Sequence, residues 1–454
     1  MSANPELKFE SRDEFQRRKI AEKVIKLLKS EISVSPMVID GTWGLGKTEF
    51  CHKLIDLMQE EDCHELIYID AFKADHANEP LLTVLAEVVK SLPDDNQRNN
   101  LIQKALPALR YSLKAGAKAV VSHLLKQDVA DVVEGFEQEV QQVTDKAIDT
   151  SVESLLKDHV DAEKNLEALR KSLATVTADK PLVIFIDELD RCRPDFAVLM
   201  LETIKHTFDV EGVQFVLVTN TEQLKASINH CYGPTIDAQR YLDKFLKFSF
   251  TLPSTIRNYN YETRLASAQH YINQILHSPI LKDSGLERDS YLALMERIIE
   301  VNKISLREVE TFVRHLEIYQ MLSDEDPLGN KVWSYKLLRL LGISLYCFNP
   351  ELAKETVGNK LDAKRLGEFL LLQGELPALD QNGHYPEYAD IILFALSKEC
   401  KFNVDFYNSS NSELETKWQS LAEQIFEDRY WISKGERLKV VIEAVISLGL
   451  TESR

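Results

Sequence analysis

Eight consecutive residues, Gly41–Thr48 (GTWGLGKT), have the spacing of a loop that binds phosphate groups. Its glycines let the backbone turn sharply and bring N–H groups close to phosphate oxygens. Lys47 supplies positive charge to the β- and γ-phosphates, and the Thr48 hydroxyl can ligate Mg²⁺. The alternative is a chance match in a glycine-containing turn. The predicted nucleotide contacts are Gly41, Thr42, Trp43, Gly44, Leu45, Gly46, Lys47, Thr48 and Glu49.

The acidic run Asp187–Arg191 (DELDR) follows a run of branched apolar residues. An aspartate at the end of such a strand can hold Mg²⁺ between two terminal phosphates, so Asp187 and Thr48 are the predicted metal ligands. Glu188 is placed to accept a proton from the attacking water or to orient it, and Asp190 could share either task. The alternative is an ordinary polar strand end with helix-capping acids.

Three further polar residues are candidates for the catalytic site. Asn220 follows a predicted strand and could report hydrolysis through a hydrogen bond to the γ-phosphate or the water; a turn-forming asparagine is the alternative. The charge that develops on a transferred phosphoryl group favours a nearby guanidinium, which Arg240 or Arg307 could supply. Ser305 and Glu308 predict a capping box with Arg307 in the first helical turn. Structural salt bridges explain most arginines, however.

Alternating strands and helices would position these residues. Short apolar runs predict parallel strands, and the helical patterns between them predict crossovers that cover both faces of the sheet. A strand before the phosphate loop and a helix from Lys47 to about Gln59 meet the context that the motif requires. The expected fold class is α/β. The predicted strands are Met37–Asp40, Leu66–Asp70, Val183–Ile186, Val213–Val218 and Lys247–Leu252.

Helical patterns also set the domain boundaries. Residues 91–178 read as helices inserted into the sheet domain, because structureless loops of that length are rare. No clear parallel-sheet strand follows Pro253. We expect a P-loop NTPase core over residues 1–253, a helical lid over 254–320 and a C-terminal helical domain over 321–454.

Charge and composition limit the partners and the compartment. The chain has 454 residues and a net charge of −18, which argues against general binding to the phosphate backbone of nucleic acids. A local basic groove, for example at Arg110, Lys114 and Lys118, remains an alternative. The same charges interrupt the apolar segment 105–125, so no membrane span is expected. Six scattered cysteines without a CxxC pair, and no secretory leader, predict a cytoplasmic protein.

Several motifs in combination resemble the KAP family of P-loop NTPases. They are Trp43 within the loop, the DELDR run at 187–191 and the YLDKF segment Tyr241–Phe245, together with the order of the segments between them. The similarity covers about residues 8–320. It implies ATP hydrolysis on an additional-strand core related to AAA+ and STAND switches. Arg307 is similar to the second sensor that AAA+ relatives carry on a lid helix.

The sequence also departs from the family pattern. Many members carry membrane-spanning helices between the loop and the acidic strand, whereas the insertion at 91–178 is charged here. Position 188 is Glu in a run that is commonly DDLDR, and Asn220 stands where many relatives have aspartate. These two differences resemble an AAA+ arrangement and are compatible with hydrolysis.

The resulting hypothesis is an ATP- and Mg²⁺-dependent switch or motor that acts on an unknown protein partner and can form homo-oligomers. The family resemblance suggests anti-phage defence. A non-hydrolysing, nucleotide-gated scaffold is one alternative. A DNA-acting, AAA+-like loader is another, although the acidic charge disfavours it.

Overall fold

The computed structural model describes most of the chain in two compact units, residues 1–252 and 253–454. The described ranges are 8–77, 79–92, 94–112, 152–257, 263–323, 326–329, 333–371, 386–426 and 435–450. Part of the predicted insertion and the side chains of the possible basic groove (Arg110, Lys114 and Lys118) lie outside the described residues.

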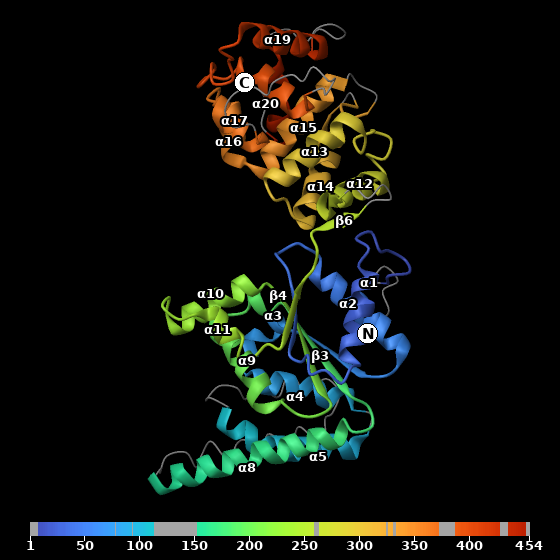
Figure 1. The fold of residues 1–454 in the computed structure, drawn as a ribbon, viewed down its shortest axis with the longest axis vertical. Coiled ribbons are helices and arrows are strands. Elements are labelled where there is room, and N and C mark those ends of the chain that lie inside the picture. Colours follow the sequence, from blue (N-terminus) through green and yellow to red (C-terminus); the bar gives the residue numbers. More distant parts are fainter. Residues whose placement is uncertain are drawn as a thin grey trace. The chain divides into compact units, whose positions relative to one another are not determined.

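A five-stranded parallel sheet forms the centre of the first unit (Figure 1). Its spatial order is β2-β3-β4-β1-β5, so β4 separates the strand before the phosphate loop from the strand before the acidic run. This confirms the expected α/β class. The strands are β1 (Met37–Asp40), β2 (Glu65–Asp70), β3 (Leu182–Asp187), β4 (Val213–Thr219) and β5 (Phe248–Thr251).

Helices cover both faces of this sheet. On one face, α1 (Arg18–Leu28) and α2 (Lys47–Glu61) share a buried core with β1, β3 and β4. Apolar residues recur on α2 at helical spacing, from Phe50 to Met58, and form the stripe that packs there. The opposite core includes residues of α4 (Pro80–Ser91), α9 (Pro194–Thr207), α10 (Thr221–Tyr232) and α11 (Ala238–Leu242).

Helices α5 (Asp95–Ser112) and α8 (Val152–Val176) lie side by side at the start and end of the predicted insertion. Leu101 of α5 and Leu169 and Leu173 of α8 are fully buried in the core of the second sheet face. The described part of the insertion is therefore helical. In the part of the chain that the structure describes, no helix is both long and apolar enough to span a bilayer.

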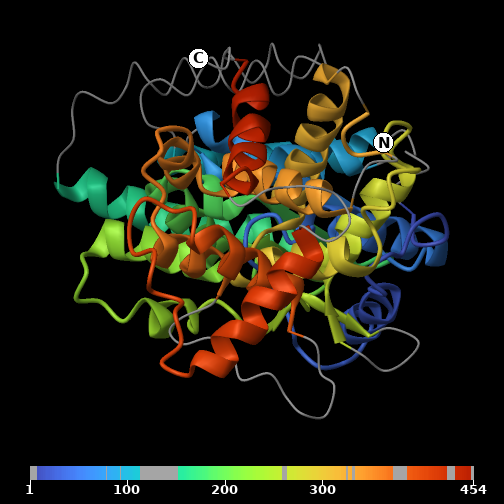
Figure 2. The same ribbon diagram turned by 90° about the horizontal axis from the view of Figure 1, so that it is seen from above.

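The second unit is mostly helical, as Figure 1 shows and Figure 2 shows from above. It opens with a short antiparallel pair, β6 (Thr255–Arg257) and β7 (Thr263–Leu265), which the sequence did not predict. The segments expected as a lid and as a C-terminal domain contribute to one hydrophobic core. Its helices are α12 (Ala266–His277), α13 (Asp289–Val301), α14 (Leu306–Leu322), α15 (Trp333–Phe348), α16 (Pro350–Val357), α17 (Ala363–Leu370), α18 (Tyr388–Ser397), α19 (Ser412–Phe426) and α20 (Arg437–Leu448).

The close approach of α15 and α20 generates a prediction about stability. A Cβ atom at Gly342 would lie 2.7 Å from the carbonyl oxygen of Val441 and 2.9 Å from Cβ of Ala444. We expect Gly342→Leu to lower the free energy of unfolding by about 1–3 kcal/mol through overpacking. Urea unfolding followed by tryptophan fluorescence measures this, since Trp418 is buried in the same core.

The matched control is Gly358→Ala, because the atoms nearest to its added Cβ are carbonyl oxygens of the preceding helix α16, the closer of them at 3.2 Å. Gly358→Ala should lower the free energy of unfolding by less than Gly342→Leu does. Equal unfolding midpoints for Gly342→Leu and the wild type would contradict the close packing of α15 on α20.

Candidate functional site

The phosphate loop joins the carboxyl end of β1 to the first turn of α2. Gly46 directly precedes α2 and has φ 80°, a left-handed conformation that glycine adopts without the steric cost of a Cβ atom. Helix α2 therefore begins at Lys47, immediately after the turn. Its free N-terminal amides and the positive end of its dipole make this end of the helix suited to an anion.

The Lys47 side chain is folded back onto the loop. Its Nζ donates to the carbonyl oxygens of Gly41 at 2.7 Å and Thr42 at 3.2 Å. Burial lowers the pKa of Lys47, and the nearby carboxylates of Asp190 and Asp187 oppose that shift. The ammonium is thus buried near Asp190 and Asp187, and the loop carbonyls accept its hydrogen bonds. This is the position at which the motif requires a cation that binds phosphate.

The alternation of β3 places Asp187 on the face that α2 covers. Val183 and Phe185, which share its parity, pack in the core with α2. Asp187 is buried, and its Oδ1 accepts the Glu188 N–H at 2.8 Å. Burial raises the pKa of Asp187, whereas hydrogen bonds from Thr48, the Glu188 N–H and Tyr68 lower it.

The Thr48 hydroxyl lies beside two of the three carboxylates of the acidic run, Glu188 and Asp187. It donates to Glu188 Oε1 at 3.3 Å, and its proximity to Asp187 lowers the pKa of that carboxyl. Two segments far apart in the sequence thus bring a hydroxyl and a buried carboxylate together near Lys47. Oxygen donors of this kind are those that Mg²⁺ prefers, so the donor set fits the metal that the motif implies.

Glu188 occupies a strained turn at the end of β3. Its φ is 61°, which is unusual for a residue with a side chain and is often found at functional sites. Its Oε2 pairs with Arg191 Nε at 2.5 Å. Burial and then the Asp187 charge raise the pKa of Glu188, and the Arg191 charge lowers it. The carboxylate is therefore held at the site by two polar partners, Arg191 and Thr48.

Asp190 connects three segments of the site. Its Oδ2 accepts the indole N–H of Trp43 at 2.5 Å, and its Oδ1 accepts the Thr219 hydroxyl at 3.1 Å. Both oxygens thus have protein donors, one from the phosphate loop and one from the end of β4. Asp190 thus tethers the phosphate loop to the end of β4, and its share in handling the attacking water stays a prediction. Trp43 itself remains 50% exposed.

Asn220 is placed as the strand order requires, directly after β4 and between the loop and the acidic run. Its Oδ1 accepts the Glu222 N–H at 3.1 Å and caps α10. This is the local role that the sequence left open as the alternative. A contact between Asn220 and the γ-phosphate stays a prediction.

Arg240 and Glu49 each pair with a nearby side chain on the same segment, and Arg307 lies in the second unit. The Arg240 side chain is 86% exposed and pairs with Asp237 at 3.2 Å. Arg307 is exposed in the first turn of α14, behind the predicted Ser305 capping box, and belongs to the second unit. Glu49 pairs with Lys53 at 2.7 Å. The nucleotide contacts proposed for these residues stay predictions.

Two residues at the site were missed from the sequence. Tyr68 of β2 donates its phenol hydrogen to Asp187 Oδ2 at 3.1 Å, and Thr219 of β4 binds Asp190. Burial raises the pKa of Tyr68 well above its ordinary value, so the phenol keeps its proton. No sequence pattern pointed to Tyr68, because the register that sets it opposite Phe185, two residues before Asp187, is decided by the packing of the sheet.

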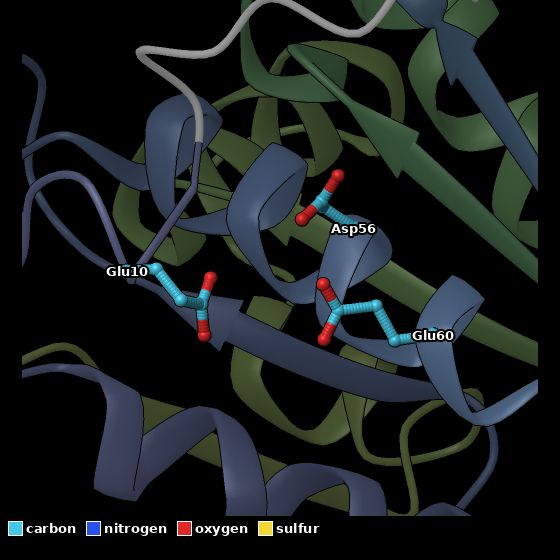
Figure 3. Close-up of side chains that lie close together, drawn as sticks. All are labelled: Glu10, Asp56 and Glu60. Carbon is cyan, nitrogen blue, oxygen red and sulfur yellow. The ribbon is translucent and has the colours of Figure 1, made fainter.

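A separate acidic group lies near the start of the chain, where Glu10 faces Asp56 and Glu60 of α2 (Figure 3). Lys8 Nζ lies 3.2 Å from Asp56 and 3.6 Å from Glu60, and Arg18 pairs with Glu10 at 2.6 Å. These cations already balance the carboxylates. The group is therefore explained as a surface charge network.

Comparison with known proteins identifies one family. A family model described as the KAP family P-loop domain matches residues 17–323, which is more than half of the chain. The matched segment includes the phosphate loop, the acidic run and the helices as far as α14. A search of curated proteins gives no match.

The Asp190 tether can be tested by a double-mutant cycle. We expect Asp190→Ala to destabilise the protein by about 1–3 kcal/mol, because the Trp43 and Thr219 donors lose their acceptor. Trp43→Phe removes only one of these bonds. Urea unfolding of both single variants and the double variant should give a double-variant effect smaller than the sum. Strict additivity would contradict the tether.

Proposed function

This chain belongs to the KAP family of P-loop NTPases, and we propose that it binds ATP with Mg²⁺ and hydrolyses it as a switch or motor. One observation carries the proposal. The Thr48 hydroxyl, the Asp187 carboxylate and the Lys47 ammonium lie together at the carboxyl edge of the sheet, although the first and second come from segments far apart in sequence.

Phosphate binding uses the loop and the start of α2. Backbone N–H groups of Gly41–Gly46 and of the first turn of α2 surround the terminal phosphates. Lys47 Nζ exchanges the Gly41 carbonyl for phosphate oxygens, which are stronger partners because they are charged. This exchange also relieves the cost of keeping an ammonium buried.

The metal site uses Thr48 and Asp187. When bound, Mg²⁺ neutralises charge on the β- and γ-phosphate oxygens. The Thr48 hydroxyl would present an oxygen lone pair to the metal and could keep its proton for Glu188, because a hydroxyl is both an acceptor and a donor.

Glu188 is the proposed general base. It would orient the attacking water and accept its proton while the γ-phosphoryl group departs in line. Burial raises its pKa, which makes the carboxylate a better proton acceptor than an exposed one. Asp190 keeps Trp43 of the loop beside the acidic turn, and Asn220 would report the state of the γ-phosphate.

A guanidinium would complete the site. Arg240 extends into solvent, which supports a role toward a neighbouring subunit in a homo-oligomer rather than within its own site. Arg307 would act as a sensor on α14. A role in anti-phage defence rests on the family resemblance alone. The cytoplasmic location rests on the six scattered cysteines without a CxxC pair. A protein partner belongs to the proposed switch or motor role.

Removal of the loop cation tests nucleotide binding. We expect Lys47→Ala to abolish measurable ATP binding, because Lys47 is the lysine of the phosphate-binding motif and its ammonium lies on the loop carbonyls. Fluorescence titration with an ATP analogue measures it, and far-UV circular dichroism checks the fold. Lys73→Ala is the control, since its side chain is 83% exposed. Unchanged affinity in Lys47→Ala would refute the site.

Neutralising the proposed base separates hydrolysis from binding. Glu188→Gln should lower steady-state phosphate release roughly a hundredfold to ten-thousandfold while ATP affinity is retained, because the amide cannot accept the proton of water. The control is Glu60→Gln, at the opposite end of α2 from the loop, and its steady-state phosphate release should equal that of the wild type. Negligible turnover already in the wild type would instead favour the non-hydrolysing scaffold.

A further inference from the structure

The phenol of Tyr68 and the imidazole of His52 form a layer behind Asp187. We infer that Tyr68 is a positioning residue of the magnesium site, fixing the orientation of Asp187, and that the His52 ring holds Tyr68 in place. This inference rests on the proposed function, because it concerns the metal that the nucleotide would bring. It assigns a role to two residues outside both sequence motifs.

The strand register brings Tyr68 to Asp187. Tyr68 pairs with Phe185 between β2 and β3, so its side chain lies diagonally across from Asp187 on the same sheet face. Its hydroxyl donates to Oδ2 at 3.1 Å, and the Glu188 N–H donates to Oδ1 at 2.8 Å. Each carboxylate oxygen thus has a fixed donor, and the group cannot rotate without losing one of them.

The orientation matters because a metal ligand must present its lone pairs in a set direction. Groups that hydrogen-bond a metal-ligating side chain without touching the metal fix the orientation of that side chain. Their removal typically weakens metal binding about 10- to 100-fold. Asp187 is also buried, and burial disfavours its charged form. A donor that stays on Oδ2 favours the carboxylate over the neutral acid.

His52 completes the layer from helix α2. It lies one turn after Thr48, so the two side chains are on the same side of the helix. The His52 and Tyr68 ring centroids are 4.5 Å apart with an interplanar angle of 42°. Helix α2 therefore carries the proposed metal ligand Thr48 and also His52. The ring of His52 packs on Tyr68, which in turn holds the other proposed ligand, Asp187.

The decisive variant is Tyr68→Phe, which keeps the ring and its stacking and removes only the hydroxyl. We expect the Mg²⁺ concentration at half-maximal binding of a fluorescent ATP analogue to rise about tenfold or more. Binding of the same analogue in excess EDTA should not change, because Tyr68 touches the metal ligand and not the phosphate loop. A merely structural role would not separate these two measurements.

Tyr232→Phe is the matched control. Its phenol also binds a carboxylate, Glu202 Oε1 at 2.9 Å, but on helices α10 and α9. Its Mg²⁺ midpoint should equal that of the wild type. For His52, replacement by Ala should raise the midpoint, and replacement by Phe should restore it, since an aromatic ring again backs Tyr68.

The outcomes distinguish the inference from the proposed function. If wild-type binding depends on Mg²⁺ and Tyr68→Phe has the same midpoint, the inference is wrong and the proposed function stands. Equal midpoints for the two His52 variants would remove the supporting role of that ring. If the wild type shows no Mg²⁺-dependent binding of the analogue, the proposed metal site itself is refuted.

Discussion

The structure of the site depends on a local imbalance of charge. Three carboxylates, Asp187, Glu188 and Asp190, lie near the buried ammonium of Lys47, and Arg191 pairs with one of them, Glu188. Burial raises the pKa of both Asp187 and Glu188. Buried charges are costly unless they are paired. The described site meets this cost with hydrogen bonds from Thr48, Tyr68, Trp43 and backbone N–H groups, and a divalent cation with a polyphosphate would balance it more fully.

The strand order makes room for such a ligand. Because β4 lies between β1 and β3, the phosphate loop and the acidic run leave the sheet at the same edge but not from adjacent strands. Ligands of open α/β sheets bind at the carboxyl ends of the strands for this reason. Thr48 at the start of α2 reaches Glu188 of the acidic run across this separation. The end of β4, which lies between the loop and the acidic run, contributes Thr219 and Asn220.

Rigid and adjustable contacts are distributed differently within the site. Asp187 is fixed through both of its oxygens by β2 and by its own turn. Glu188, in contrast, is held through side-chain contacts with Thr48 and Arg191. A fixed proposed metal ligand beside a proposed base that is held by side chains suits a cycle in which nucleotide state alters the acidic turn.

Sequence alone determined the features that depend on residues close together in the chain. Short apolar runs that alternate with helical patterns predicted the five strands and the α/β class. The GxxxxGK[ST] spacing predicted the loop, and Trp43, DELDR and YLDKF in combination predicted the family. Only tertiary structure decided which side chains meet. Trp43 and Asp190 are 147 residues apart, and Tyr68 and Asp187 are 119 apart. Such contacts follow from strand order and register, which arise from the packing of the whole sheet and leave no fixed spacing in the sequence.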